Sequence, residues 1–307
     1  MVEKINKYID NLPLNIEPDG LYAPIRYTLS EGGKRLRPAL MMLAYELWKE
    51  NAEDILQQAV ALEMYHNCTL LHDDVMDNAD MRRGRPTVHK KWDVNTAILS
   101  GDNMLCLAVK WMGTNPEVAT TFIDTTIEIN HGQQHDVDFE KRDDVTEEEY
   151  IEMIRLKTSV LLACATKIGA LMAGAPKEDV ELMYDFGVSL GLAFQLQDDY
   201  LDVYGDPETF GKKIGGDILC NKKTYMLINA MRLSDSHEWL YADYASPEEK
   251  IAAVTGIYNT LGIDKLAQAK MEEYYHKAIE ALDKVNVPEE RKTALREYAA
   301  DMMKRQK

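Results

Sequence analysis

Apolar residues recur at helical spacing along most of the chain. Leu182, Phe186 and Leu190 belong to a stripe that repeats every three to four residues between positions 180 and 203, which is the period of a helix with one buried face. Residues 153–171 are apolar on most faces, as expected of a helix in the middle of a bundle. Period-2 alternation, the mark of a half-buried strand, is scarce. The pattern therefore predicts an all-α fold.

Helix-breaking residues separate these segments without dividing the chain into domains. Glycine and proline cluster at intervals, for example at 32–33, 174–176 and 205–207, and each cluster marks a turn. No stretch between them is long enough, or simple enough in composition, to serve as an interdomain linker. We therefore expect residues 1–307 to form a single large helical bundle.

Composition and charge exclude several classes of protein. Hydrophobic residues make up 46% of the 307 positions, and 35 Lys and Arg against 52 Asp and Glu give a net charge of −17. Without a broad basic face, such a chain is not a general nucleic-acid-binding protein. We find no uncharged apolar run long enough for a membrane span and no signal-peptide pattern. The four scattered cysteines predict buried, reduced thiols, so we expect a cytoplasmic protein.

Two aspartate-rich motifs follow apolar helical stretches. The first, DDVMD at 73–77, places the carboxylates of Asp73 and Asp77 at i and i+4, on one face of a helix. The second, DDYLD at 198–202, occurs in the same context. Like charges held together on apolar helices are unfavourable unless a cation neutralises them. Oxygen ligands that are completed by water and phosphate oxygens favour Mg²⁺.

Basic residues cluster beside both motifs, although the chain as a whole is acidic. GGKRLRP at 32–38 precedes the first motif, and RRGRP at 82–86 follows it. GKKIGGD at 211–217 and NKKT at 221–224 follow the second. Metal-bound carboxylates beside Arg, with its paired donors, and Lys, a compact point charge, suit a diphosphate. One such loop alone could equally be solvated surface, but their pairing with both aspartate motifs favours a diphosphate site.

These motifs resemble those of the trans-polyprenyl diphosphate synthase family, which includes farnesyl and geranylgeranyl diphosphate synthases. The likeness extends from about Pro24 to Lys223 and includes GGKRLRP, LLHDDVMDNADMRRGRPTVH, Gly132-Gln133, RLKTS, FQLQDDYLDVYGD and GGDI in the family order. It implies a helical bundle around a central cavity and a prenyltransferase that joins isopentenyl diphosphate head to tail to dimethylallyl, geranyl or farnesyl diphosphate. It also implies three Mg²⁺ ions, for which Mn²⁺ could substitute, and a homodimer.

The resemblance assigns the site residues position by position. The isopentenyl diphosphate site comprises Lys34, Arg37, His66 and Arg83. The allylic diphosphate site comprises Arg82, Lys157, Thr158, Gln195, Lys212 and Lys222. The metal ligands are Asp73, Asp77 and Asp198, with Asp74, Asp199, Asp202 and Asp217 as alternates or as partners of metal-bound water. Lys213 stays an alternative to Lys212, because both follow Gly211 where the family has a single Lys.

The implied reaction begins with ionisation of the allylic substrate. Thr158, Gln195 and the Lys157 carbonyl are the catalytic groups, because they offer partial negative charge to the allylic cation without trapping it. The double bond of isopentenyl diphosphate then attacks the cation, and a proton is lost to the released diphosphate.

Small side chains before the first aspartate motif bear on product length. Short-chain family members often carry an aromatic residue five positions before the first Asp, where this chain has Cys68, followed by Thr69. Tyr65, one turn earlier, is the first aromatic residue on that side and lies about 4.5 Å deeper. Taking these three residues as the floor of the product pocket, we expect a C20 product, with C15 and C25 as the flanking lengths.

Two other functions compete with the synthase. A class I terpene cyclase also combines an aspartate-rich motif with Mg²⁺, but it usually carries an Asn/Ser/Glu metal motif instead of a second DDxxD. It also has no need of Lys34, Arg37 and His66. A catalytically silent partner subunit, or an acidic scaffold, would be expected to lose Asp or Arg residues from the motifs, and none is missing. The sequence therefore favours the synthase.

Overall fold

The computed structural model describes residues 1–206 and 214–304, which are mostly helical. The elements are, in chain order, α1 (Val2–Asp10), α2 (Asp19–Ser30), α3 (Leu36–Glu46), the 3-10 turn η1 (Ala52–Ile55), α4 (Leu56–Met76), β1 (Met81–Arg82), β2 (Arg85–Pro86), α5 (Val88–Lys91), α6 (Val94–Met112), α7 (Pro116–Phe139), α8 (Glu147–Ile154), the π-helical turn η2 (Arg155–Ser159), α9 (Val160–Ala173), α10 (Lys177–Tyr204), α12 (Gly216–Leu219), α13 (Tyr225–Leu233), α14 (Glu238–Tyr241), α15 (Pro247–Leu261), α16 (Ile263–Lys284) and α17 (Glu289–Met303). Within these residues the two short strands pair antiparallel, Met81 opposite Pro86. The all-α prediction is confirmed.

The described chain divides into two compact units. The first contains residues 1–124 and 164–180, and the second contains the remaining described residues. Helices α7, α9 and α10 each contribute residues to both units. The assignment of residues 1–307 to one domain stays a prediction.

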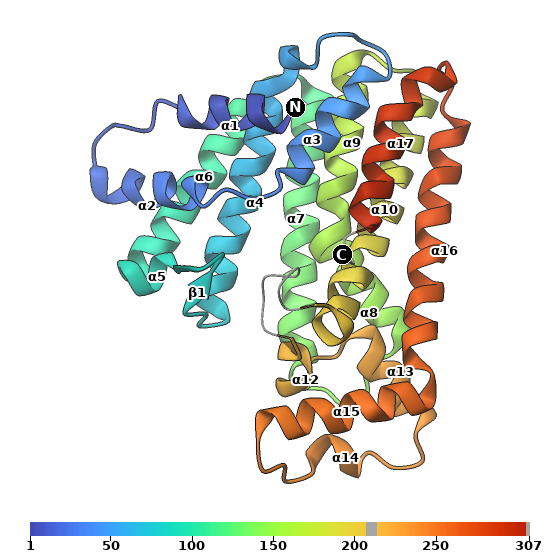
Figure 1. Ribbon diagram of the computed structural model, residues 1–307. Helices are drawn as coiled ribbons and strands as arrows, with labels where there is room; N and C mark the ends of the chain where they lie inside the picture. The colour runs from blue at the N-terminus through green and yellow to red at the C-terminus, as the bar shows by residue number, and fades with distance from the viewer. Residues whose placement is uncertain (207–213, 305–307) are drawn as a thin grey trace. The chain divides into compact units, whose positions relative to one another are not determined.

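In the first unit, helix α4 is the element against which the others pack (Figure 1). Helices α1, α2, α3 and α6 all contact it, and its residues 59–65 are buried without exception, as in a helix that is surrounded on all sides. Helix α6 approaches α4 closely at Gly101, where a Cβ atom would overlap the His72 ring. Glu63 is the one charged residue in the buried stretch of α4.

The second unit has a hydrophobic core of its own. Helix α13 packs against α8, α15 and α16, and these helices contribute to one cluster of buried side chains. Among its larger members are Tyr150, Met153, Leu196, Met226, Tyr258, Ile263 and Met271. Thr224 begins α13 by accepting a hydrogen bond from the Leu227 amide with its side chain, a common N-cap arrangement.

Residues 155–159 form the π-helical turn η2, where the sequence predicted one regular helix over 153–171. The backbones of two other helices lie close to this turn. A Cβ atom on Gly132 of α7 would overlap the backbone of Lys157, and one on Gly191 of α10 would lie 2.5 Å from Ser159 Cα. The composition of RLKTS is that of an ordinary helix, so nothing in the sequence marks the extra residue. Isolated π-turns occur frequently at functional sites.

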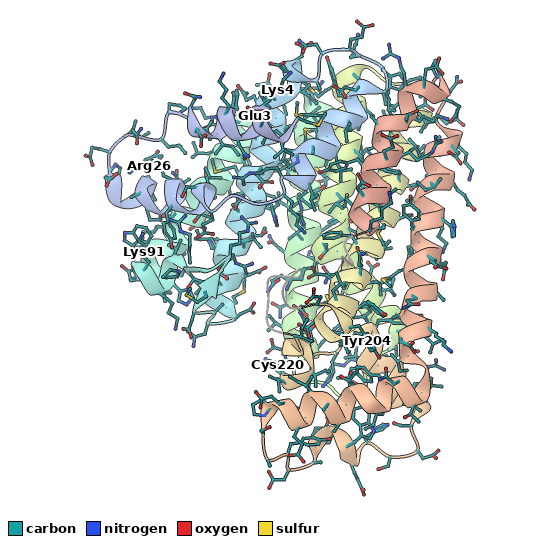
Figure 2. All side chains as sticks on the ribbon, viewed as in Figure 1. Glu3, Lys4, Arg26, Lys91, Tyr204 and Cys220 are labelled. Atoms are coloured by element: carbon teal, nitrogen blue, oxygen red, sulfur yellow. The ribbon has the colours of Figure 1, made fainter. Side chains whose placement is uncertain are left out.

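Two cysteines differ from the expectation of buried thiols. Cys68 and Cys164 are buried, but Cys106 and Cys220 are exposed, and all four are free (Figure 2 labels Cys220). The reason is local: Cys220 ends the four-residue helix α12, and Cys106 lies on α6, which also exposes Leu99 and Val109. A small residue that suits either environment carries no positional signal.

One segment has the length and composition of a membrane span. It covers Glu147–Ala173, and 72% of its most apolar window is buried inside the structure. Burial of this extent is the pattern of a core helix, so the segment is weak evidence for a membrane span.

We expect Gly191→Ala to destabilise the protein by about 1–3 kcal/mol, the usual cost of forcing atoms into a packed interior. The added Cβ meets Ser159 Cα, a backbone atom that cannot rotate away. Gly256, in α15, is a matched control because no atom lies within 4 Å of a Cβ built there. Gly256→Ala should leave stability unchanged or raise it by up to about 1 kcal/mol. Urea unfolding followed by circular dichroism compares the two, and equal stabilities would contradict the close approach of α10 to η2.

Candidate active site

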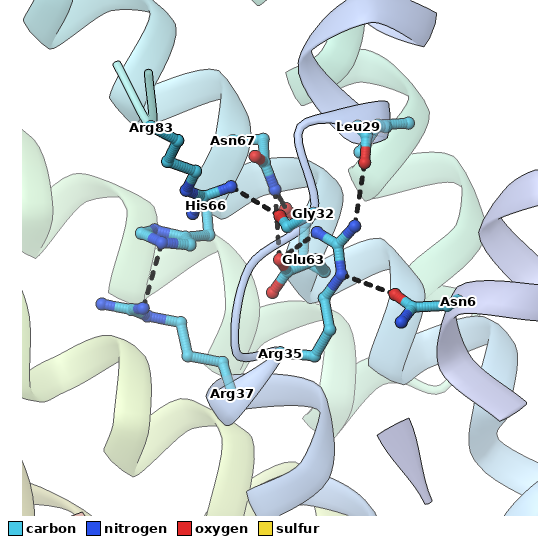
Figure 3. Close-up of polar contacts among 9 residues, drawn as sticks. All are labelled: Asn6, Leu29, Gly32, Arg35, Arg37, Glu63, His66, Asn67 and Arg83. Atoms are coloured by element: carbon cyan, nitrogen blue, oxygen red, sulfur yellow. Dashed lines mark hydrogen bonds and ion pairs between the residues drawn. The ribbon is translucent and has the colours of Figure 1, made fainter. Parts of the chain in front are cut away.

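The family resemblance assigns four residues to the isopentenyl diphosphate site, and all four belong to neighbouring elements of the first unit. Figure 3 draws three of them. Arg37, the second residue of α3, lies with its Nη1 atom 3.1 Å from His66 Nε2 on α4. Arg83, in the turn between β1 and β2, donates from Nη1 to the Gly32 carbonyl at 2.6 Å. Lys34 is exposed in the loop that follows Gly32. The loop before α3, helix α3 and the β-turn thus supply adjoining cationic groups, and α4 supplies His66.

Gly33 is required where this loop meets Arg83. Its φ angle of +124° is one that side-chain-bearing residues rarely adopt, and a Cβ atom would lie 3.0 Å from Arg83 Nη1. The glycine pair therefore does more than make the loop flexible. Gly33 lets the backbone approach the Arg83 guanidinium, and the Gly32 carbonyl accepts a hydrogen bond from the same guanidinium.

His66 is held in the neutral state. Arginine can only donate hydrogen bonds, so Nε2 of His66 accepts from Arg37 and the ring proton resides on Nδ1. Burial lowers the pKa of His66 well below its ordinary value, and the charges of Arg37 and Arg83 lower it further. The imidazole therefore orients Arg37 without adding a charge of its own.

The first aspartate motif ends helix α4. Asp73 is half-buried, Asp77 is exposed at the C-cap, and Asp74 is buried. Asp74 Oδ1 accepts a hydrogen bond from Arg82 Nε at 2.8 Å, which directs Arg82 toward the motif. The C-terminus of a helix carries partial negative charge, so three carboxylates there repel both the helix end and one another. A bound cation would offset that repulsion.

In the second unit, a chain of hydrogen bonds fixes Gln195. Thr158 Oγ1, in η2, donates to Gln195 Oε1 at 3.0 Å, and Gln195 Nε2 donates to Asp199 Oδ1 at 2.9 Å. The buried Tyr150 hydroxyl donates to the other Asp199 oxygen. Both ends of the Gln195 amide are therefore specified, since only the amide nitrogen can donate to a carboxylate.

The remaining residues of the second aspartate motif differ in environment. Burial raises the pKa of Asp199 to about 7, with the Asp217 charge as the next cause. Asp202 is engaged with the backbone: its Oδ2 atom accepts from the Asp217 amide at 2.9 Å. Asp198, one turn before Asp202, is half-buried. Asp202 thereby holds the GGD turn against the end of α10.

Lysines of the second unit lie near carboxylates, and two of them form close ion pairs. Lys157 Nζ lies 2.6 Å from Asp136 Oδ2 on α7. Lys222 is exposed, with Nζ 4.0 Å from Asp217 Oδ1, and its neighbour Lys223 pairs with Asp143 at 3.1 Å. Lys212, and with it the choice between Lys212 and Lys213, lies outside the described residues.

Sequence reasoning missed two residues of this network, Asp136 and Tyr150. Asp136 follows Gly132 by four positions, so both lie on the face of α7 that approaches η2. That spacing was a usable signal once Gly132 was noted. Tyr150 had none, because a lone tyrosine on the buried face of an amphipathic helix is ordinary core material.

The donor set fits a hard divalent cation. Asp73 and Asp77 in the first unit, and Asp198 in the second, present only carboxylate oxygens, the ligands that Mg²⁺ prefers. The helix-end repulsion at α4 is a second indication, since it is relieved by positive charge. Within residues 1–206 and 214–304, no three His, Cys, Asp or Glu side chains are grouped to hold a metal ion by themselves. This arrangement is compatible with Mg²⁺, which usually keeps waters and phosphate oxygens in its coordination shell.

The residues proposed as the floor of the product pocket lie one turn apart on α4. Tyr65 and Cys68 are each 3% exposed, whereas Thr69 is half-buried and donates from Oγ1 to the His66 carbonyl at 2.8 Å. The Tyr65 ring packs edge-on against Phe122 of α7, with 5.4 Å between the ring centroids. Phe122 was not anticipated from the sequence, because 57 positions separate it from its partner.

The chain is similar to known proteins along nearly its whole length. Residues 18–261 match the family described as polyprenyl synthetase. The chain is 39% identical to a geranylgeranyl diphosphate synthase of Methanosarcina mazei, over 98% of this chain and 95% of that protein. It is 38% identical to a geranylfarnesyl diphosphate synthase of Natronomonas pharaonis, over 85% and 84%.

Solved structures give the same result. A crystal structure of geranylgeranyl pyrophosphate synthase matches with a TM-score of 0.93 and 42% identity, covering 100% of this chain and 99% of that one. The geranylgeranyl pyrophosphate synthetase of Geoglobus acetivorans matches with a TM-score of 0.89 and 32% identity, covering 98% and 97%.

We expect His66 to stay neutral in the folded protein between pH 8 and pH 6, with the proton on Nδ1. Multiple-bond ¹H–¹⁵N NMR distinguishes this tautomer, and two protonated ring nitrogens at pH 6 would contradict it. An unfolded-state histidine takes up a proton below about pH 6.5. His66 therefore contributes stability that is present above that pH and is lost as the pH falls toward its lowered folded-state pKa. His66→Gln should remove this part of the pH dependence of the unfolding free energy.

Proposed function

The chain belongs to the polyprenyl synthetase family, and from this membership we propose that it condenses isopentenyl diphosphate with an allylic diphosphate to give a short all-trans prenyl diphosphate. The observation that carries the proposal is the ending of two long helices, α4 and α10, in aspartate-rich motifs that lie beside cationic side chains in each unit. The names of similar proteins, geranylgeranyl and geranylfarnesyl diphosphate synthases, support C20 as the main product and C25 as one flanking length. C15 is proposed as the other flanking length.

The allylic diphosphate would bind to the cationic groups that the family resemblance assigns to it. Arg82 supplies a guanidinium whose direction is set by Asp74, Lys157 supplies an ammonium group paired with Asp136, and the exposed Lys222 supplies a second one. Lys212 is proposed as a further ligand. Asp73, Asp77 and Asp198 would hold Mg²⁺, three ions in all and replaceable by Mn²⁺, which when bound neutralises charge on the departing diphosphate.

Gln195 and Thr158 are proposed to face the allylic cation. An amide oxygen or a hydroxyl oxygen presents partial negative charge, yet neither attacks a carbocation as readily as a carboxylate would. The hydrogen bonds from Thr158 to Gln195 and from Gln195 to Asp199 fix these dipoles in advance. Such preorganisation means that little reorganisation is required when the cation forms.

Isopentenyl diphosphate would bind to the basic cluster of the first unit. Lys34, Arg37 and Arg83 supply charge, and neutral His66 orients Arg37. Its double bond then attacks the allylic cation, and a proton leaves to the released diphosphate. The reaction requires that water be kept from the reacting carbons, because water would trap the allylic cation.

We propose that the enzyme acts in the cytoplasm as a homodimer. Four large apolar side chains are exposed on helix α6 of the first unit: Val94, Ile98, Leu99 and Val109. A surface of this kind favours burial against another protein, and a two-fold symmetric contact between identical chains is the commonest way to cover it.

A class I terpene cyclase is the second candidate and is less well supported. It would make no use of the cluster of Arg37, His66 and Arg83, which the structure builds from three separate elements. Release of diphosphate that depends on isopentenyl diphosphate separates the two functions.

Asp73→Ala should lower the turnover number by about two orders of magnitude or more, the size expected when transition-state electrostatics are lost. The fold should persist, because the change relieves repulsion at the end of α4. Diphosphate release from dimethylallyl and isopentenyl diphosphate at saturating Mg²⁺ measures the effect. Asp80→Ala is the matched control, since Asp80 is an exposed carboxylate paired with Lys90 just beyond the motif. Turnover within about threefold of wild type for Asp73→Ala would contradict the site.

Tyr65→Ala should lengthen the product by at least one C5 unit, because it removes the buried ring that packs against Phe122. Tyr65→Phe retains the ring and should leave product length unchanged. Chromatography of the dephosphorylated products compares both variants with the wild type. If Tyr65→Ala gives the wild-type distribution, the floor lies on another helix.

A further inference from the structure

A buried ion pair lies beside Arg37, His66 and Arg83 of the first unit (Figure 3). Arg35 Nη1 is 2.8 Å from Glu63 Oε1, and the two side chains are only 2% and 3% exposed (Figure 3). Moving two charges out of water is costly, and such a pair is often no more stabilising than apolar residues of the same volume. The presence of the charged Glu63 in the otherwise apolar buried stretch of α4 therefore calls for a reason besides stability.

Arg35 ties its loop to three different helices. Besides Glu63 of α4, it donates from Nε to Asn6 Oδ1 of α1 at 3.0 Å and from Nη2 to the Leu29 carbonyl of α2 at 2.8 Å. Each of the three guanidinium nitrogens thus donates to a group of the protein itself.

The backbone of Arg35 needs such anchoring. Its φ angle is +48°, in the left-handed region that costs a residue with a side chain roughly 1 kcal/mol or more. This conformation reverses the chain between Lys34 and the first turn of α3, which carries Arg37. A backbone of this kind persists only where its surroundings specify it.

Glu63 connects the same anchor to the His66 segment. Its carboxylate also lies 3.3 Å from Asn67 Nδ2, and Asn67 donates to the Glu63 carbonyl at 2.8 Å. Asn67 is fully buried and adjoins His66 in the chain. The Glu63 carboxylate thereby contacts both Arg35, which follows Lys34, and Asn67, which follows His66.

We infer that Arg35 and Glu63 are positioning residues for the isopentenyl diphosphate site, fixing Lys34, Arg37 and His66 in the arrangement that receives the diphosphate. The inference rests on the proposed function. It predicts a specific kinetic effect, since loosening this network changes the geometry of one substrate site.

The test is the steady-state kinetics of Glu63→Gln, which keeps the shape of the side chain and removes its charge. We expect the Michaelis constant for isopentenyl diphosphate to rise about tenfold, whereas that for the allylic diphosphate changes less than about twofold. The turnover number at saturation should stay within about threefold of wild type. Glu53→Gln is the matched control, because Glu53 forms an exposed ion pair with Lys4 in the same unit, and it should change neither constant.

Equilibrium binding gives a measurement that does not depend on turnover. Isothermal titration of isopentenyl diphosphate should show about tenfold weaker binding to Glu63→Gln than to wild type. If Glu63→Gln fails to fold, Arg35→Lys replaces it. This variant keeps the charge but loses the guanidinium that reaches Asn6 and Leu29. We expect it to raise the Michaelis constant for isopentenyl diphosphate several-fold. Thermal unfolding of each variant accompanies the kinetics.

The outcomes separate the inference from the proposed function. A wild-type protein without condensation activity would refute the function. An active wild type whose variant loses stability but keeps both Michaelis constants would show a purely structural ion pair. An equal rise for both substrates would show a general disturbance of the fold. Either of the last two results overturns the inference.

Discussion

The placement of carboxylates at the C-terminal ends of helices is the constraint from which the candidate site follows. The end of α4 carries Asp73, Asp74 and Asp77, where the helix dipole is already negative. Each unit offsets part of the charge of its own aspartate-rich motif. Arg82 pairs with Asp74, Asp202 takes up a backbone amide in the second unit, and buried Asp199 receives two hydrogen bonds. The carboxylates that remain accessible suit a divalent cation and its phosphate ligands.

The sequence predicted the fold class and most site residues because their signals are local. Helical periodicity is visible within a dozen residues, and the spacing of Asp73 and Asp77 fixes their common face without tertiary information. Partners that are distant in sequence were beyond reach. Phe122 behind Tyr65, Asp136 beside Lys157 and Tyr150 behind Asp199 all depend on packing between helices.

The differences from expectation have a common physical origin. Residues 155–159 have good helical composition, yet they form a π-turn because Gly132 and Gly191 admit two other backbones beside it. Close approach of backbones is set by tertiary packing, which propensity does not encode. The exposed thiols of Cys106 and Cys220 likewise depend on which surface of α6 and α12 is covered. Arg35 is a further case: the sequence grouped it with the basic residues suited to a diphosphate, and its hydrogen bonds to three helices make it an anchor.

The π-turn also has a consequence for how this segment can vary. A turn of this kind holds one residue more than an ordinary helical turn, which advances every later side chain of the continuous helix by about 100° around the axis. Removing a single residue from 155–159 would restore a regular helix, but it would rotate Lys157 and Thr158 relative to the face formed by α9. Length in this segment is therefore under stricter constraint than residue type. Related chains should tolerate substitutions at Arg155 or Leu156 far more readily than a one-residue deletion beside them.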